Sequence, residues 1–264
     1  MARKIMLLSI VSLLIYGCGT SDVNTIFFDV VTVDKTVKLS NDEGSPVCSV
    51  HLDVAYATEK NGHKADVINE IIQNRLLDMS ELTMKQAVDS FANSYTESYI
   101  RNFLPLYNQD RADTTKRSWY EYHYVMTCKT QGGGMGTSCY LATIDYFEGG
   151  AHGVNMLKTI LFDNTTGNEL TLDNLFLKGY EKPLSAILTK ALQEKMGVKD
   201  KKALREMGFL KNMEMFPSKN FLLNDETITF IYNPDEIASY DQGSTEITIA
   251  LSALDRLLKK EYKQ

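Results

Sequence analysis

The most constraining feature of this 264-residue chain is a pair of strand-like segments separated by a cluster of glycines. Residues 118–130 and 137–147 alternate aromatic or aliphatic side chains with polar ones, and four of the five residues 132–136 are glycine. Alternation with a period of two is typical of β-strands, and glycine-rich connections favour tight turns. We therefore expect an antiparallel β-hairpin here.

The expected hairpin carries two cysteines. Folding it about the glycine cluster places Cys128 opposite Cys139, where a cross-strand disulfide would form in an oxidising compartment. Two free thiols are the alternative, because cross-strand disulfides are often strained. Cys48 lies in a separate alternating segment, so we expect it to be a small buried apolar residue.

The same register predicts a tyrosine face on the first strand of the hairpin. Tyr120, Tyr122 and Tyr124 would lie on that face, across from Phe147 and Asp145. We expect these tyrosines to be buried beneath a neighbouring helix. The alternative is an exposed binding surface, for which tyrosine is well suited.

Helical spacing marks the region before the hairpin. Apolar residues across 67–77 recur at the spacing of an amphipathic helix, and a second helix is expected to begin at Thr83, with Gln86 completing a capping box. Its aromatic residues from Phe91 to Phe103 follow one face and are expected to be core. Pro105 is expected to end this helix.

The remaining elements alternate between strand and helix patterns. Strands are expected at 26–33, 47–56, 154–162, 221–223, 227–232 and 246–250, and helices at 183–196, 200–207 and 251–258. The predicted fold class is α+β, with mixed or antiparallel sheets, packed helices and two intimately associated subdomains. We place these at residues 26–136 and 137–264.

The N-terminus predicts the compartment. Arg3 and Lys4 precede an apolar run over 5–15 that is too short to span a bilayer, which is typical of a signal peptide over 1–17. Residues 15–18 resemble the lipobox of bacterial lipoproteins, which implies cleavage before Cys18, acylation of that cysteine and a short lipidated tether over 18–25. A plain secretory signal that happens to contain a cysteine is the alternative.

The net negative charge of the chain limits which partners it can bind. The formal net charge is −6, and removal of Arg3 and Lys4 would make it more negative, so nucleic acid is not expected as a partner. The expected location is the bacterial cell envelope, outside the cytoplasm and facing the periplasm or the surface. The lipid anchor would make the membrane one partner, and an envelope protein or peptidoglycan another.

Familiar catalytic signatures are absent from the sequence. The four histidines form no close metal-ligand pattern, and no nucleophile elbow or phosphate-binding loop is present, so no metal or cofactor is expected. His152 is the one candidate, with Asp145 and Glu148 as possible partners, joined by the acidic pair 235–236. The alternative, which we favour, is a structural histidine bonded to the backbone of its own glycine turn.

Two stretches carry a family resemblance. Residues 146–153, which include Gly-Gly-Ala-His-Gly, and residues 220–243 together resemble the signature of a bacterial extracytoplasmic domain family of uncharacterised function. That domain is similar to the outer part of a lysozyme-sensing anti-sigma factor and to the non-catalytic N-terminal part of peptidoglycan deacetylases. The chain departs from the family pattern at Asp235, Ser239 and Asp241. The resemblance supplies no catalytic residues.

The expected function is therefore a non-catalytic, lipid-anchored envelope module that binds a protein, such as a lysozyme-like muramidase, or a cell-wall ligand. The candidate ligand-binding residues are Tyr120, Tyr122, Tyr124, His152 and Tyr240. A cell-wall hydrolase or deacetylase that uses His152 with nearby acids is one alternative. A passive structural lipoprotein is the other.

Overall fold

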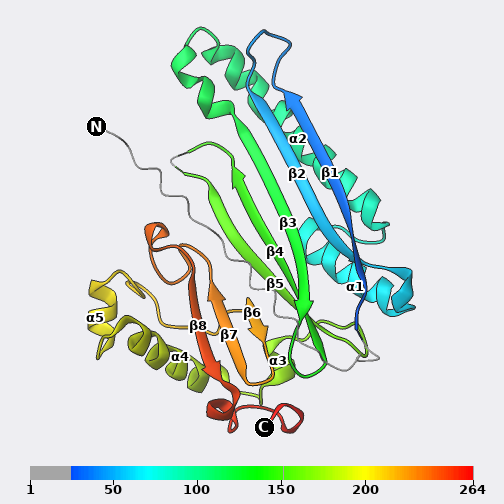
Figure 1. Ribbon diagram of the computed structural model, residues 1–264. Coiled ribbons are helices and arrows are strands. Elements are labelled where there is room, and N and C mark those ends of the chain that lie inside the picture. The colour runs from blue at the N-terminus through cyan, green and yellow to red at the C-terminus, as the bar shows by residue number, and fades with distance from the viewer. Residues whose placement is uncertain (1–24, 151, 264) are drawn as a thin grey trace, which may run out of the picture.

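The computed structural model describes residues 25–150 and 152–263, and this part of the chain forms two sheets with packed helices (Figure 1). The larger sheet contains β1 (Phe28–Lys38), β2 (Val47–Ala57), β3 (Tyr122–Gly132), β4 (Thr137–Phe147) and β5 (Val154–Asp163). The smaller sheet contains β6 (Phe221–Leu223), β7 (Thr227–Tyr232) and β8 (Thr245–Ala250). The helices are α1 (Lys64–Ile72), α2 (Met84–Asp110), α3 (Leu172–Leu175), α4 (Glu181–Met196) and α5 (Lys201–Glu206). The predicted α+β class is confirmed.

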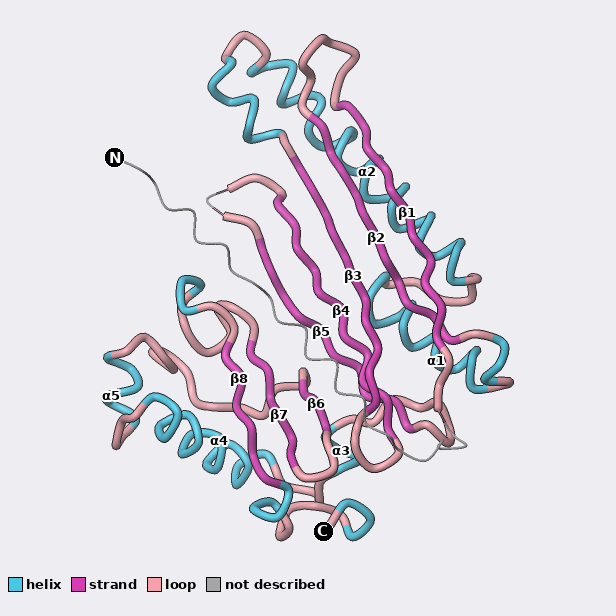
Figure 2. The backbone as a smooth tube through the Cα atoms, viewed as in Figure 1, coloured by secondary structure: helices cyan, strands magenta, loops and turns pink. Residues whose placement is uncertain are grey.

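Strand order explains why helices cover one face of the larger sheet. The strands lie in sequence order, and only the β2–β3 pair is parallel. Parallel neighbours need a long crossover connection. Here the crossover contains α1 and α2, and the tube in Figure 2 shows both helices beside β1 and β2.

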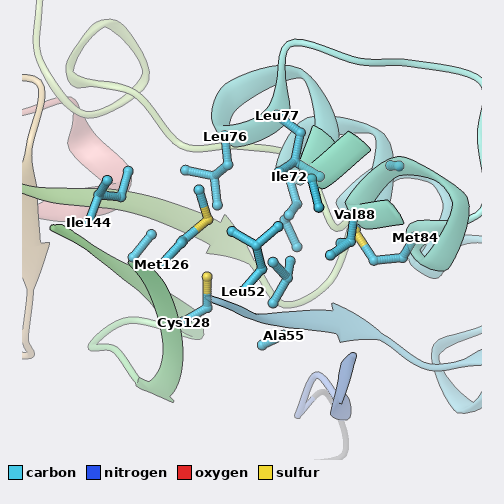
Figure 3. Packing of buried hydrophobic residues seen from close by; sticks show 14 of the residues in the cluster. Leu52, Ala55, Ile72, Leu76, Leu77, Met84, Val88, Met126, Cys128 and Ile144 are labelled. Atoms are coloured by element: carbon cyan, nitrogen blue, oxygen red, sulfur yellow. The ribbon is translucent and has the colours of Figure 1, made fainter. Parts of the chain in front are cut away.

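The first hydrophobic core lies between this helix layer and the sheet. Leu52, Met126 and Ile144 project from three strands toward Ile72 of α1 and Val88 of α2 (Figure 3). Each of the five side chains is at most 2% exposed. Burial of such a side chain stabilises the fold by roughly 1.5–3 kcal/mol relative to leaving it in water.

The start of α2 was predicted correctly, but its end was not. Gln86 N–H donates to the Thr83 hydroxyl, and Thr83 N–H donates to Gln86 Oε1, which together make the expected capping box. The helix then continues past Pro105 to Asp110, so the predicted stop is wrong. Asp110 anchors this last turn, because its carboxylate accepts hydrogen bonds from the Tyr120 hydroxyl and the Lys116 ammonium.

The hairpin exists, but the predicted register is wrong. Cys128 lies opposite Ala142, and Cys139 lies opposite Gln131. Side chains alternate across a strand, so the shift by three residues puts the two cysteines on opposite faces of the sheet. Cys128 enters the first core and Cys139 the second, and both are free thiols. The expected disulfide is therefore wrong and the alternative of two free thiols is confirmed, and Cys48 is fully buried as expected.

A contact with the second sheet sets the turn of this hairpin. Gly134 N–H donates to the Leu223 carbonyl, and a Cβ atom at Gly134 would lie only 2.2 Å from backbone atoms of Asn224 and Asp225. Only glycine permits so close an approach. The turn is thus shaped by residues about 90 positions away in sequence, which local spacing does not reveal.

The second core joins α4 and the smaller sheet to the outer face of β4 and β5. Leu184, Leu188 and Phe230 are fully buried in it, together with Cys139 of β4 and Leu161 of β5.

The predicted domain boundary at 136/137 falls in the β3–β4 turn, within a single sheet. The two sheets instead separate after β5. The helix expected at 251–258 is only a 3₁₀ turn at Leu251–Leu254.

Candidate functional site

The glycine turn connects β4 to β5 and presents His152 at the surface. Gly149 and Gly150 have φ values of 81° and 96°, which side chains with a Cβ rarely adopt. A Cβ atom at Gly149 would also come within 3.3 Å of the Trp119 carbonyl oxygen. The turn therefore requires glycine for both its conformation and its packing, as the sequence predicted.

His152 stacks on Tyr240, which comes from the second half of the chain. The ring centroids are 3.9 Å apart and the rings are nearly parallel, at 23°. The Nδ1–H of His152 donates to the Gly153 carbonyl at 2.9 Å, so this nitrogen is bonded within the turn itself. As expected for a structural histidine, His152 uses one ring nitrogen to bond the backbone and one ring face to pack against Tyr240.

The acids predicted to approach His152 have other partners. Asp145 accepts a hydrogen bond from His123 Nε2 at 2.8 Å, and Glu148 accepts one from the Tyr95 hydroxyl at 2.7 Å. The structure therefore does not join His152, Asp145 and Glu148 into one unit. Among residues 25–150 and 152–263, no group of histidine, cysteine and acidic side chains is placed to hold a metal ion.

His152 and Tyr240 line an open groove of about 490 Å³ that follows the outer edge of β5. Asp235 and Glu236, the acidic pair singled out in the sequence, also line it. Glu236 is partly occupied, because its carboxylate accepts the Asn233 N–H at 2.8 Å. The groove lies where the edge of the larger sheet meets the loops of the smaller one.

Two asparagines form the wall of the groove and satisfy the free edge of β5. Asn233 Oδ1 accepts Leu157 N–H at 2.7 Å, and its Nδ2 donates to the Leu157 carbonyl at 3.0 Å. Asn220 Oδ1 accepts Thr159 N–H at 3.1 Å. Unpaired strand edges are prone to aggregation, so this pairing both protects β5 and ties the two halves together.

Lys158 lines the groove in surroundings that disfavour its charged form. It is half-buried, and no hydrogen bond or ion pair reaches its ammonium from the part of the chain that the structure describes. Burial lowers the pKa of Lys158, and the positive charge of Arg75 lowers it further. Arg75 itself lies 3.5 Å from Glu169. Lys158 is thus a desolvated cation without an ion-pair partner among the described residues, although Asp235 and Glu236 line the same groove.

The tyrosine face belongs to the core. Tyr120 and Tyr122 are 7% and 8% exposed, and the Tyr122 ring lies 4.7 Å from that of Phe103 on α2. Tyr124 is half-buried against Phe91, with ring centroids 5.1 Å apart. The expectation that these tyrosines pack beneath a helix is therefore confirmed.

Across the sheet, Tyr124 pairs with Tyr146, and Phe147 and Asp145, which were predicted to lie opposite the tyrosine face, pair with His123 and Val125 instead. This is the same register error that misplaced the two cysteines.

The charged and amide residues that line the groove could not be identified as site residues from the sequence. Arg75 and Lys158 stood in patterns assigned to a helix and a strand, and only the fold brings them together. Asn220 and Asn233 lay within the family-like stretch, but their spacing gave no indication of a role. Cys18, the predicted lipidation site, lies outside the described residues.

Comparison with known proteins agrees with this fold. Residues 173–252 match a family described as a protein of unknown function (DUF3298). The chain also resembles the peptidoglycan-N-acetylmuramic acid deacetylase PdaC of Bacillus subtilis, at 25% identity over 180 residues. That match covers 67% of this chain but only 37% of the deacetylase, so the chain spans well under half of that relative.

Two solved structures share the architecture. A DUF3298 family member from Bacteroides fragilis has a TM-score of 0.83 at 25% identity, covering 89% of this chain and 94% of that one. A DUF3298 family protein from Pseudomonas aeruginosa has a TM-score of 0.62 at 16% identity, covering 90% and 97% respectively. The predicted resemblance to a domain family of uncharacterised function, and to a peptidoglycan deacetylase, is therefore confirmed.

Replacing Asn233 tests whether it holds the β5 edge. Asn233→Ala removes both partners of the Leu157 backbone and leaves them partly buried, so the free energy of unfolding should fall by about 1–3 kcal/mol. Urea denaturation would measure this. Asn155→Ala is the matched control, because its exposed side chain makes only a 3.3 Å bond to Asp145. Equal losses in the two variants would contradict the role given to Asn233.

Proposed function

We propose that this protein is a non-catalytic binding module of the bacterial cell envelope, and that the groove along β5 takes an anionic peptidoglycan fragment. The unpartnered cation Lys158 is the observation that carries the proposal. A desolvated charge without a partner opposes folding, and a bound anion would offset that cost. An anionic ligand is thus the simplest reason to keep a lysine at this position.

The chemistry of the groove suits a muramic-acid sugar. In a muramyl peptide the lactyl carboxyl is amide-bonded to the peptide, and the free carboxylate lies on the peptide itself; Lys158 and Arg75 would bind that carboxylate from one wall of the groove. The rigid stack of His152 on Tyr240 offers aromatic surface against which the apolar face of a pyranose ring would pack. The exposed amide of Asn155 adds a donor and an acceptor for sugar hydroxyl or acetamido groups.

The name of the Bacillus subtilis relative supports the same ligand class, since that enzyme is described as acting on peptidoglycan N-acetylmuramic acid. Its activity is not carried over, because the chain covers only 37% of it. The geometry also disfavours the hydrolase or deacetylase alternative. In the described part of the chain, His152 has no hydrogen-bonded acid or nucleophile, and Asp145 and Glu148 are engaged elsewhere.

We propose that a lipid anchor holds the module at a membrane. A signal sequence that ends in a lipobox would tether the module to a membrane through Cys18, close to the cell wall.

Cys18→Ala should release the protein from the membrane fraction and remove the mass of the acyl groups. Fractionation and intact-mass measurement would show this, with Cys48→Ala as the control that keeps the anchor. A Cys18→Ala protein that stays in the membrane fraction with an unchanged mature mass would contradict the proposed lipid anchor.

The ligand is tested by calorimetric titration with N-acetylmuramyl dipeptide. Lys158→Met should raise the Kd at least about 10-fold, the effect expected when one charge-assisted hydrogen bond is lost. Exposed Lys178 provides the control, and Lys178→Met should leave the Kd unchanged. Chitobiose, which has no carboxylate, should bind more weakly than the dipeptide to the unchanged protein.

Lys158→Met should not destabilise the fold. Because the folded-state pKa is lowered, the unfolded chain binds more protons, so stability rises with pH between that lowered pKa and the usual lysine value. The variant should lose this pH dependence and be as stable as the unchanged protein at neutral pH, or more so. Binding that falls only because the variant unfolds would contradict the proposal.

A muramidase as titrant in the same assay distinguishes the protein ligand suggested by the resemblance. If a muramidase binds equally well to the unchanged protein and to Lys158→Met, and the dipeptide does not bind, the ligand is a protein and not a cell-wall fragment.

A further inference from the structure

A second groove, of about 1080 Å³, lies on the opposite edge of the larger sheet, between β1 and the starts of α1 and α2. It is independent of the β5 groove, with which it shares no residue. Apolar side chains line part of it, and two of them, Val30 and Leu82, are 51% and 38% exposed. The charged residues of its lining are four carboxylates and one lysine.

The charge of this groove is one-sided. Glu59, Asp66, Glu70 and Glu81 all line it, all are exposed, and none of them forms an ion pair within the described residues. The single cation of the lining, Lys85, is paired with Asp89 at 2.9 Å. Asp66 and Glu70 are one turn apart on α1, where like charges repel and weaken a helix. A cationic ligand would relieve that repulsion.

A buried acceptor without a donor gives an independent indication of a ligand. Gln73 is 3% exposed and is part of the groove lining. Its Nε2 donates to the Leu82 carbonyl at 2.8 Å, but its Oε1 has no hydrogen-bond partner in the described part of the chain. Leaving a buried acceptor unpaired is costly, and an N–H donor would satisfy it once a bound ligand opens access to this atom, which is shielded from solvent in the unliganded groove.

The strand beside the groove has a free edge. In β1 the odd-numbered residues pair with β2, since Thr58 N–H donates to the Phe27 carbonyl and Leu39 N–H to the Pro46 carbonyl. The even-numbered residues therefore direct their backbone groups away from β2, and β1 has no other neighbour among the described strands. Thr32 is such a residue and lines the groove. An extended peptide would find backbone partners here.

We propose that this acidic groove binds an extended, lysine- or arginine-rich segment of a partner protein, which adds to β1 as an extra strand. The carboxylates would pair with its cationic side chains, Val30 and Leu82 would contact its apolar ones, and Gln73 Oε1 would accept an N–H. A second copy of this chain is a poorer occupant, because its own acidic groove would face the first.

The test is fluorescence anisotropy of the full chain with a fluorescein-labelled heptapeptide of alternating lysine and valine. Asp66→Asn with Glu70→Gln should raise the Kd at least 10-fold. Glu97→Gln with Glu226→Gln is the charge-matched control, because both residues are exposed, lie outside the groove and form no ion pair with any described residue, and it should change the Kd less than threefold. Equal weakening by the two pairs would reduce the effect to net charge and overturn the proposal.

Strand addition is tested separately. Thr32→Pro removes an outward N–H without breaking the β1–β2 ladder, a change that edge strands tolerate, and it should abolish peptide binding. Retained binding in a folded Thr32→Pro protein would overturn the strand geometry. Lys158→Met should leave peptide binding unchanged, so failure here and failure of the β5 groove are distinguishable.

Discussion

The architecture depends on how the outer edge of β5 is satisfied. The larger sheet ends at this strand, and an open edge would leave the backbone groups of Leu157 and Thr159 without partners. Asn233 and Asn220 provide those partners from the loops of the smaller sheet. Because side chains rather than a sixth strand cover the edge, the two sheets do not merge, and a groove remains between them.

The same arrangement links the fold to the proposed function. A strand edge covered by short amides leaves space for a ligand, and it brings Lys158 of β5 close to Arg75, which follows α1. Lys158 is half-buried beside the like charge of Arg75, which disfavours the unliganded state, and a bound carboxylate would remove part of that cost. The stacked pair His152 and Tyr240 would orient the ligand without taking part in chemistry.

Local patterns predicted local structure well. The capping box at Thr83 and Gln86, the buried aromatic face of α2 and the glycine-dependent turn before His152 all follow from short-range chemistry. The hairpin register failed because Gly134 packs against a turn far along the chain. The groove was missed for a related reason: Lys158, Arg75 and Asn233 are ordinary residues in sequence and meet only through tertiary contacts.

Hydrogen exchange measured by mass spectrometry, with and without N-acetylmuramyl dipeptide, tests whether the β5 edge forms the ligand site. We expect slower exchange on ligand addition in residues 152–158 and 234–240, with no change in β1. Protection confined to β1 or α2, or no change along β5 at saturating ligand, would contradict it.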